Sequence, residues 1–196
     1  MGSSPIEMTT LALTLDDGPD AETTPALLDL LAAHHAHATF FPMAERAAAH
    51  SGLIARMVGE GHTVGVHCVA HVRHTESHGD AIRRDTDRAL TALRGLGASP
   101  VLWRTPWGDT AWFSHEVARE RGLRIVGWDV DTHDWRGDRA EAMLAATRPA
   151  LGPGAVILAH DGVGPGARRT DASETVRYAE QLITYASRSG LTLEAL

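Results

Sequence analysis

Two adjacent aspartates, Asp16 and Asp17, end an apolar stretch and stand just before a Gly-Pro break. Two like charges this close raise the pKa of one carboxyl group unless a cation lies between them. The pair therefore predicts a bound cation, with one aspartate as its ligand and the other free to act as a base toward water. The alternative is a turn in which the Asp-Gly-Pro segment caps a helix.

A second candidate is the segment HCVAH, which places His67 and His71 four residues apart. This spacing predicts two imidazoles on one side of a helical turn, suited to a divalent metal. The alternative is a solvated turn, because a chain with 12 histidines forms such pairs by chance. A carboxylate from another strand end would complete a set of two His and one Asp, with positions left open for water and substrate.

These residues need elements that bring them together, and the chain alternates strand-like and helix-like segments. The predicted strands are 9–16, 38–42, 63–67, 101–104, 124–131, 155–160 and 191–194. The predicted helices are 24–36, 45–59, 80–96, 114–121, 139–150 and 173–189. Such alternation predicts parallel strands with helical crossovers, in an open doubly wound sheet or a closed barrel.

The first strand-to-helix turn carries Asp-Asp-Gly-Pro, where a dinucleotide-binding fold would carry a glycine-rich loop. The polar residues of interest instead collect at the carboxyl ends of predicted strands, and in a barrel these ends share the face on which active sites are built. They are Asp16, Asp17, His67, Arg104, Asp131 and His160.

The length of 196 residues predicts one α/β domain over 1–196, with a motif core at 10–160 and a C-terminal helix and strand at 173–196. The net charge of −7 argues against nucleic acid or an anionic membrane as partner. No run approaches the roughly 20 apolar residues of a membrane span. One cysteine excludes an intrachain disulfide, and no oligomeric state is predicted. Without a secretory signal pattern the default expectation is a cytoplasmic protein, or a secreted one if the N-terminus was trimmed.

Five stretches, in order, match the motifs of one family. They are TLDDG at 14–18, HCVAH at 67–71, RTPWG at 104–108, DTHDW at 131–135 and LAH at 158–160. The chain thus resembles the polysaccharide deacetylases of carbohydrate esterase family four, the NodB-homology domain. The resemblance implies a distorted (β/α)7 barrel, in agreement with the number of predicted strands.

The resemblance also implies roles for individual residues. Asp17, His67 and His71 would bind one divalent metal ion, with zinc as the leading candidate and cobalt, nickel or manganese as others. Asp16 would be the catalytic base and His160 the general acid.

Supporting roles follow from the same motifs. Arg104 would hold Asp16 in place, and Asp131 would pair with His160 and keep it protonated. The backbone N–H of Trp107, flanked by Pro106 and Gly108, would help bind the oxyanion. Leu158 and Trp135 would wall the pocket for the acyl methyl group.

The chain departs from the family pattern at three positions. Leu15 replaces Phe, and Trp107 replaces Tyr, which changes the shape of the cleft. Cys68 replaces a Ser or Thr whose hydroxyl would steady the histidine loop; the thiol is a weaker hydrogen bonder, and a role as fourth ligand is an alternative. The contacts of His133 and the role of the loop with Arg168 and Arg169 stay open.

The resemblance implies a hydrolase that removes N-acetyl or O-acetyl groups from an amino-sugar-containing glycan or oligosaccharide. All five tryptophans fall between positions 103 and 135, but flat rings suit many ligands besides sugars. One alternative is a deacylase or deformylase of a small-molecule amide, such as an amino-sugar metabolite. Another alternative is a metal-bound module without catalysis. The presence of both Asp16 and His160 counts against it.

Overall fold

The computed structural model describes residues 9–196, and residues 1–8, part of the predicted domain and of the segment searched for a secretory signal, lie outside the described residues. The strands are β1 (Thr10–Asp16), β2 (Thr39–Phe41), β3 (Thr63–Val64), β4 (Leu102–Trp103), β5 (Arg124–Ile125), β6 (Val130–Asp131), β7 (Val156–His160) and β8 (Thr192–Leu193). The helices are α1 (Thr23–Ala33), α2 (Ala44–Ala49), α3 (Ser51–Gly59), α4 (Gly79–Gly95), α5 (Trp112–Glu120), α6 (Ala140–Thr147) and α7 (Ser173–Arg188).

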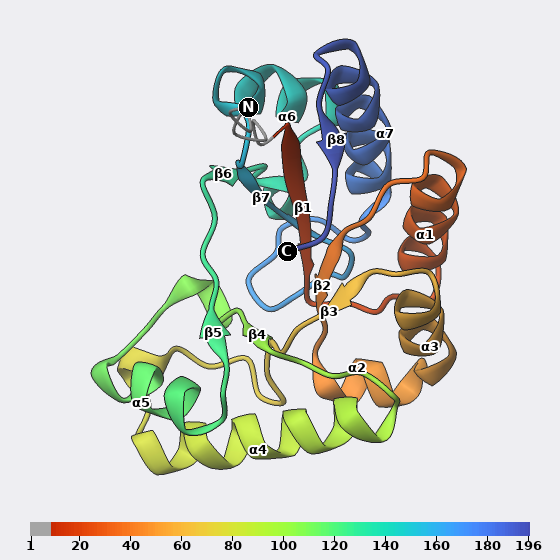
Figure 1. The fold of residues 1–196 in the computed structure, drawn as a ribbon. Coiled ribbons are helices and arrows are strands. Elements are labelled where there is room, and N and C mark those ends of the chain that lie inside the picture. The colour runs from red at the N-terminus through yellow and green to blue at the C-terminus, as the bar shows by residue number, and fades with distance from the viewer. Residues whose placement is uncertain (1–8) are drawn as a thin grey trace, which may run out of the picture.

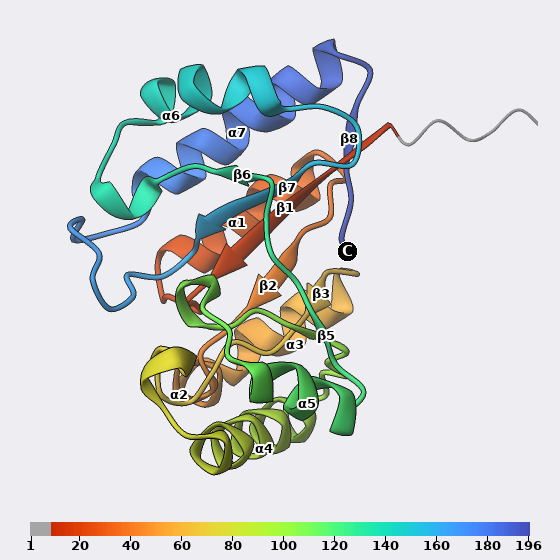
Figure 2. The ribbon, with the colours of Figure 1, turned by 90° about the vertical axis from the view of Figure 1, so that its left-hand side faces the viewer.

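The central sheet is parallel and built around β1 (Figure 1). Its order is β3-β2-β1-β7-β6, with β8 pairing beside the first residues of β1. A separate pair, β4-β5, lies on the side of the molecule that carries α4 and α5 (Figures 1 and 2), and an isolated bridge between Val66 and Trp103 links it to the β3 side. Among the described residues no ladder joins β5 to β6, so the barrel is distorted and open along that seam.

The predicted strand at 124–131 is wrong in its extent, because the chain changes partner in its middle. Val126 still donates its N–H to Trp103 of β4, whereas Asp129 donates to Val156 of β7. Between these two positions the carbonyls of Val126 and Gly127 accept hydrogen bonds from the buried Arg104 side chain. The guanidinium thus satisfies backbone groups that a continuous ladder would have paired.

Two predicted helices differ from those observed, one because it is divided and one because it ends early. The segment 45–59 divides at His50, whose backbone is not helical, into α2 and α3. The segment 139–150 leaves the α-helix after Thr147 and closes with a 3₁₀ turn, Arg148–Ala150, that contains Pro149. Proline in a helix interior removes a hydrogen bond and clashes with the preceding turn, which accounts for this ending.

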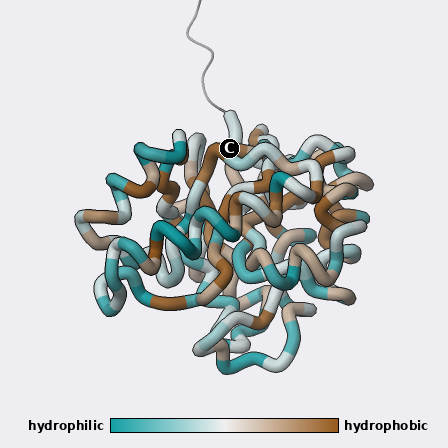
Figure 3. The backbone as a smooth tube through the Cα atoms, turned by 90° about the horizontal axis from the view of Figure 1, so that it is seen from below, coloured by the Kyte–Doolittle hydropathy of each residue, from teal (hydrophilic) through white to brown (hydrophobic). Residues whose placement is uncertain are grey.

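The interior is formed by the strands and the inner faces of the helices. Leu11, Leu13 and Leu15 of β1 are fully buried, as are Tyr178 and Leu182 of α7. Hydrophobic stretches run through the middle of the molecule, and hydrophilic ones collect on its outside (Figure 3). Over the described residues, no helix combines the length and apolar character needed to cross a membrane.

Candidate active site

The carboxyl ends of β1 and β7 meet at one cavity of about 410 Å³. Asp16 and His160 are register partners in the two strands, so the parallel pairing brings the base and acid candidates side by side. The cavity lining includes Asp16, Asp17, His67, His71, Trp107, Gly108, Trp128, Asp131, Trp135, Leu158 and His160. Five of the six polar residues expected to share this face line the cavity, whereas Arg104 does not.

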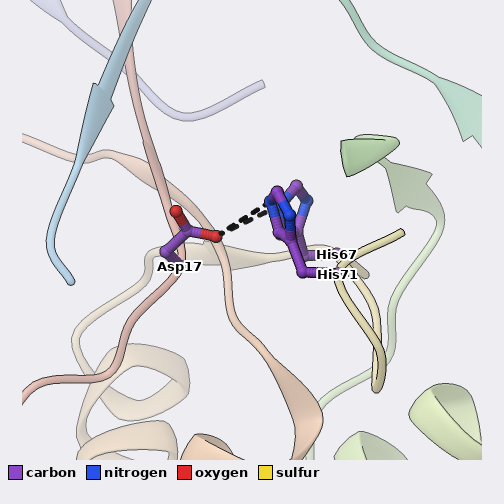
Figure 4. A group of neighbouring side chains, drawn as sticks. All are labelled: Asp17, His67 and His71. Carbon is purple, nitrogen blue, oxygen red and sulfur yellow. Dashed lines mark ion pairs between the residues drawn. The ribbon is translucent and has the colours of Figure 1, made fainter. Parts of the chain in front are cut away.

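Asp17 and the two histidines form a compact cluster. Asp17 Oδ1 lies 3.3 Å from His67 Nε2 and 3.5 Å from His71 Nε2 (Figure 4). One ligand atom from each residue falls within 4.8 Å of the others, and in residues 9–196 this is the one group of three or more such side chains with metal-binding spacing. The three residues predicted as ligands are therefore neighbours in space.

The histidines are not held by a helical turn, as the four-residue spacing predicted. The segment 67–71 is irregular backbone and is fixed by side chains from elsewhere. His67 Nδ1 lies 2.7 Å from the carbonyl oxygen of Arg104, which directs Nε2 toward Asp17. Asp85 of α4 accepts the N–H groups of Val69 and Ala70 at 3.0 and 2.8 Å. These contacts supply the support that a Ser or Thr hydroxyl at position 68 was expected to give.

The protein groups at the cluster fit a cation. Asp17 Oδ1 is buried without a hydrogen-bond partner among the described residues, an expensive arrangement unless another group satisfies it. Burial tends to raise the pKa of Asp17, but the close approach and charge of His67 hold that pKa well below its usual range. Burial lowers the pKa of His71 to about 4, which leaves its imidazole neutral, the form that binds metals.

Cys68 does not belong to the cluster. Its side chain is buried, and burial raises the pKa of the thiol, so the thiolate form that binds metals is disfavoured. Its backbone pairs with Met43 and Ala44 at the start of α2.

Asp16 is held by Arg104, as expected. Arg104 Nη1 lies 3.1 Å from Asp16 Oδ1, and the guanidinium is fully buried. The same nitrogen also donates to Thr14 Oγ1, and the guanidinium carbon lies 4.5 Å from the ring centroid of Phe41. With its backbone contacts at the seam, Arg104 is fixed from several directions, and it fixes the Asp16 carboxylate in turn.

His160 pairs with Asp134 and not with Asp131, which corrects the sequence-based expectation. Asp134 Oδ1 lies 2.7 Å from His160 Nδ1, and Asp134 Oδ2 accepts the His160 backbone N–H at 2.9 Å. Burial alone would lower the pKa of His160, but the charge and hydrogen bond of Asp134 raise it to about 9. Burial would raise the pKa of Asp134, and the opposite charge of His160 instead brings it to about 2.

The backbone after β6 explains why Asp134, and not Asp131, pairs with His160. Asp131, the last residue of β6, accepts the backbone N–H of His133 at 2.7 Å and lies 3.2 Å from its Nδ1. His133 has a left-handed backbone, φ 56°, which turns the chain so that Asp134 reaches the end of β7. The second aspartate of DTHDW was the signal that sequence reasoning passed over.

The remaining predicted residues divide into two groups. Trp107, Gly108, Trp135 and Leu158 line the cavity, whereas Pro106 is buried and does not line it. A Cβ at Gly108 would lie 2.6 Å from the Trp128 ring, so this close packing requires glycine.

Three cavity residues were not assigned this place from the sequence. Trp128 was expected within a strand but stands in the seam between β5 and β6. Arg73, two residues after His71, also lines the cavity, although no sequence motif includes it. Arg169, whose role the sequence left open, donates to Asp134 Oδ2 at 2.9 Å and to the His160 carbonyl oxygen at 2.9 Å. Arg168 is exposed.

Comparison with known proteins adds a family assignment. The family model described as polysaccharide deacetylase matches residues 4–126. A chitooligosaccharide deacetylase of Bradyrhizobium sp. is 35% identical over 94% of this chain and 87% of its own length. A peptidoglycan-N-acetylglucosamine deacetylase of Bacillus cereus is 37% identical over 83% of this chain, which spans 59% of that relative's length.

Solved structures agree with the sequence matches. The Bc1960 peptidoglycan N-acetylglucosamine deacetylase superimposes with a TM-score of 0.89 at 32% identity, over 98% of this chain and 88% of that one. A family 4 carbohydrate esterase from Streptomyces lividans, solved with acetate, gives a TM-score of 0.85 at 29% identity, over 94% and 91% of the two chains. The (β/α)7 barrel fold is thereby confirmed. The chain belongs to the polysaccharide deacetylase family, the NodB-homology domain of carbohydrate esterase family four.

Proposed function

We propose that this protein is a metal-dependent hydrolase that removes acetyl groups from the N-acetylated amino sugars of a glycan. The observation that carries the proposal is that Asp16 and His160 line one cavity beside the cluster of Asp17, His67 and His71. Arg104 holds Asp16 in place, and Asp134 holds His160. The names of the relatives, chitooligosaccharide and peptidoglycan deacetylases, support the substrate class.

Asp17, His67 and His71 would hold one divalent ion. Two imidazoles and a carboxylate suit zinc, the leading candidate, and also cobalt, nickel or manganese. The ion, when bound, supplies Lewis-acid chemistry that makes water nucleophilic near neutral pH and polarises the acetyl carbonyl.

Asp16 acts as the base. Arg104 Nη1, 3.1 Å from Asp16 Oδ1, orients one carboxylate oxygen. The other oxygen is free to take a proton from the water that attacks the acetyl carbon. Asp16 is only 4% exposed, so few waters compete for it.

His160 acts as the acid. An amine leaves poorly as an anion, so its nitrogen needs a proton as the C–N bond breaks. Asp134 accepts the Nδ1–H of His160 and stabilises the imidazolium, which leaves Nε2–H to donate to the leaving nitrogen. The raised pKa of about 9 keeps His160 protonated at neutral pH.

The walls of the cavity would position the acetyl group. Leu158 and Trp135 offer apolar surface for the acyl methyl, and the backbone N–H of Trp107, within the Pro106–Gly108 turn, would donate to the oxyanion. Backbone donors held in place before the reaction cost no reorganisation when charge develops.

The test is acetate release by metal-reconstituted protein from N-acetylated chitooligosaccharides, with formate measured alongside. O-acetylated glycans and N-acylated amino-sugar metabolites form the comparison panel. Glycan turnover that disappears in metal-loaded Asp16→Asn protein is the expected result. Turnover confined to small amides would replace the glycan assignment with the small-molecule deacylase. No turnover of any substrate, with metal bound, would contradict the proposal.

A further inference from the structure

The cavity wall beside His71 carries a cation that the proposed chemistry does not use. Arg73 follows His71 by two residues and lines the cavity. Its guanidinium carbon lies 4.6 Å from the ring centroid of Trp107, in the range of a cation–π contact. The Trp107 ring in turn lies edge-on to His71, with ring centroids 4.1 Å apart. A stacked arginine and tryptophan therefore flank the proposed metal site.

The backbone around this pair is held in place on both sides. Thr75 donates its N–H and its hydroxyl to Asp109 Oδ2, each at 2.8 Å, which ties the Arg73 loop to the Trp107 loop. His74, next to Arg73, is buried and lies 2.8 Å from Ser114 Oγ. Loops anchored in this way lose little conformational entropy when a ligand binds.

The guanidinium of Arg73 keeps its donors available. Its closest carboxylate is Glu76, 3.9 Å from Nε, and both side chains are largely exposed, so that pair is weak. No hydrogen bond within residues 9–196 reaches the Arg73 side chain, whereas the neighbouring arginines are each committed to other contacts. Those arginines are Arg46, Arg104 and Arg169.

Stacking on an indole ring orients a guanidinium and leaves its edge exposed. That edge presents two parallel N–H donors whose geometry matches a planar carboxylate. Arg73 is two residues from His71 and lines the same cavity as Asp16 and His160. Its ligand would therefore lie on a sugar next to the one that is deacetylated.

We propose that Arg73 and Trp107 form a subsite for a carboxylate on the sugar unit adjacent to the N-acetylated unit. This inference rests on the proposed glycan deacetylase function and names the substrate class: acidic glycans are preferred over neutral ones. The subsite would favour oligosaccharides with a free carboxylate on the neighbouring sugar over neutral ones such as chitooligosaccharides, the substrates named for one group of relatives.

The experiment compares two N-acetylated oligosaccharides that differ at one group, a free lactyl carboxylate in one and its primary amide in the other. The ratio of kcat/KM for acid over amide should be about tenfold in the native protein, the low end for a charged hydrogen bond at a partly exposed site. Arg73→Gln should bring the ratio near one, and Arg73→Lys should restore part of it. Arg119→Gln, an exposed arginine on α5 outside the cavity, is the matched control and should leave the ratio unchanged.

Binding of both oligosaccharides is measured in parallel by calorimetry, so that this inference and the proposed function can fail separately. Acid-selective binding that Arg73→Gln abolishes supports the subsite even if no acetate is released, in which case the deacetylase proposal fails alone. Acetate release with equal kcat/KM and equal affinity for acid and amide overturns the subsite. A preference that persists in Arg73→Gln also overturns it, because the selecting charge then lies elsewhere.

Discussion

The pairing of His160 with Asp134 leads to a prediction about pH. The substitution Asp134→Asn keeps the size of the side chain and one oxygen acceptor for His160 Nδ1, but removes the negative charge 2.7 Å away. That charge is what raises the pKa of His160 against the effect of burial. The acid should therefore lose its proton at a lower pH in the variant.

The size of the effect follows from the two pKa values. With a pKa of about 9, roughly nine tenths of His160 is protonated at pH 8. Without Asp134 the value returns to the ordinary 6.5 or below, because burial remains, and about 3% is protonated. The variant should thus lose about 30-fold in kcat/KM for amides at pH 8, but within about twofold from this cause at pH 6. A bound cation lowers the pKa of His160 in the native protein and in the variant alike. The quantity predicted is therefore the difference between the two pH values at which kcat/KM falls on the alkaline side, about 2.5 pH units.

The assay is acetate release from an N-acetylated oligosaccharide between about pH 5.5 and about pH 9.5, a range that includes both the ordinary histidine pKa and the raised value of about 9. Asp131→Asn is the comparison variant, because its carboxylate contacts His133 and not His160. In Asp131→Asn, kcat/KM should fall on the alkaline side at the same pH as in the native protein. An equal loss at pH 6 and pH 8 in Asp134→Asn, or a larger shift in Asp131→Asn, would refute the assigned pair.

Four further predictions concern single side chains. His67→Ala and His71→Ala should each lose the metal and activity together, measured by metal analysis of the purified protein, and unchanged metal in both would remove the proposed ligand set. Asp16→Asn should keep the metal while turnover collapses; loss of metal there would mean that the two aspartates share or exchange their roles. His160→Ala should lose roughly 10²–10⁴-fold on amides and far less on aryl acetates, whose phenolate leaves without a proton; equal losses on both would make His160 a positioning residue. Arg169→Ala should lower the free energy of unfolding by about 3 kcal/mol, because it removes one partner of a buried ion pair; an unchanged denaturant midpoint would show that Thr175 and the His160 N–H suffice for Asp134.

Much of the site was predictable because its residues stand at strand ends. Asp16, Asp17 and His160 follow runs of buried apolar residues, and parallel pairing necessarily brings such ends together. The pattern of alternating elements also predicted the parallel sheet. What it could not predict was the seam at 124–131, since the composition of that stretch is strand-like throughout and the change of partner depends on Arg104, which comes from elsewhere in the chain.

The residues that hold the site in place were harder to predict, because they also come from distant segments of the chain. Asp85 holds the histidine loop from a helix 14 residues beyond His71, and Arg169 holds Asp134 from a glycine-rich loop. Neither residue lies at a strand end or shows a spacing typical of catalysis. Contacts between distant segments of this kind are set by the packing of loops, which local sequence patterns do not encode.

Asp16 and Asp17 contact different partners because the backbone changes direction between them. Asp16 is the last residue of β1, and its side chain follows the pleat of the strand to Arg104. Asp17 has φ 70°, in the left-handed region, which aspartate tolerates better than most residues. This single left-handed residue takes the chain out of the strand, and the Asp17 carboxylate lies toward His67 and His71. A Cβ at Gly164 would overlap sterically with Asp17 Oδ2, so the loop after β7 restricts the same carboxylate from the far side. Two neighbouring carboxylates can therefore hold different partners, a guanidinium for one and two imidazoles for the other, because one peptide unit between them leaves the strand.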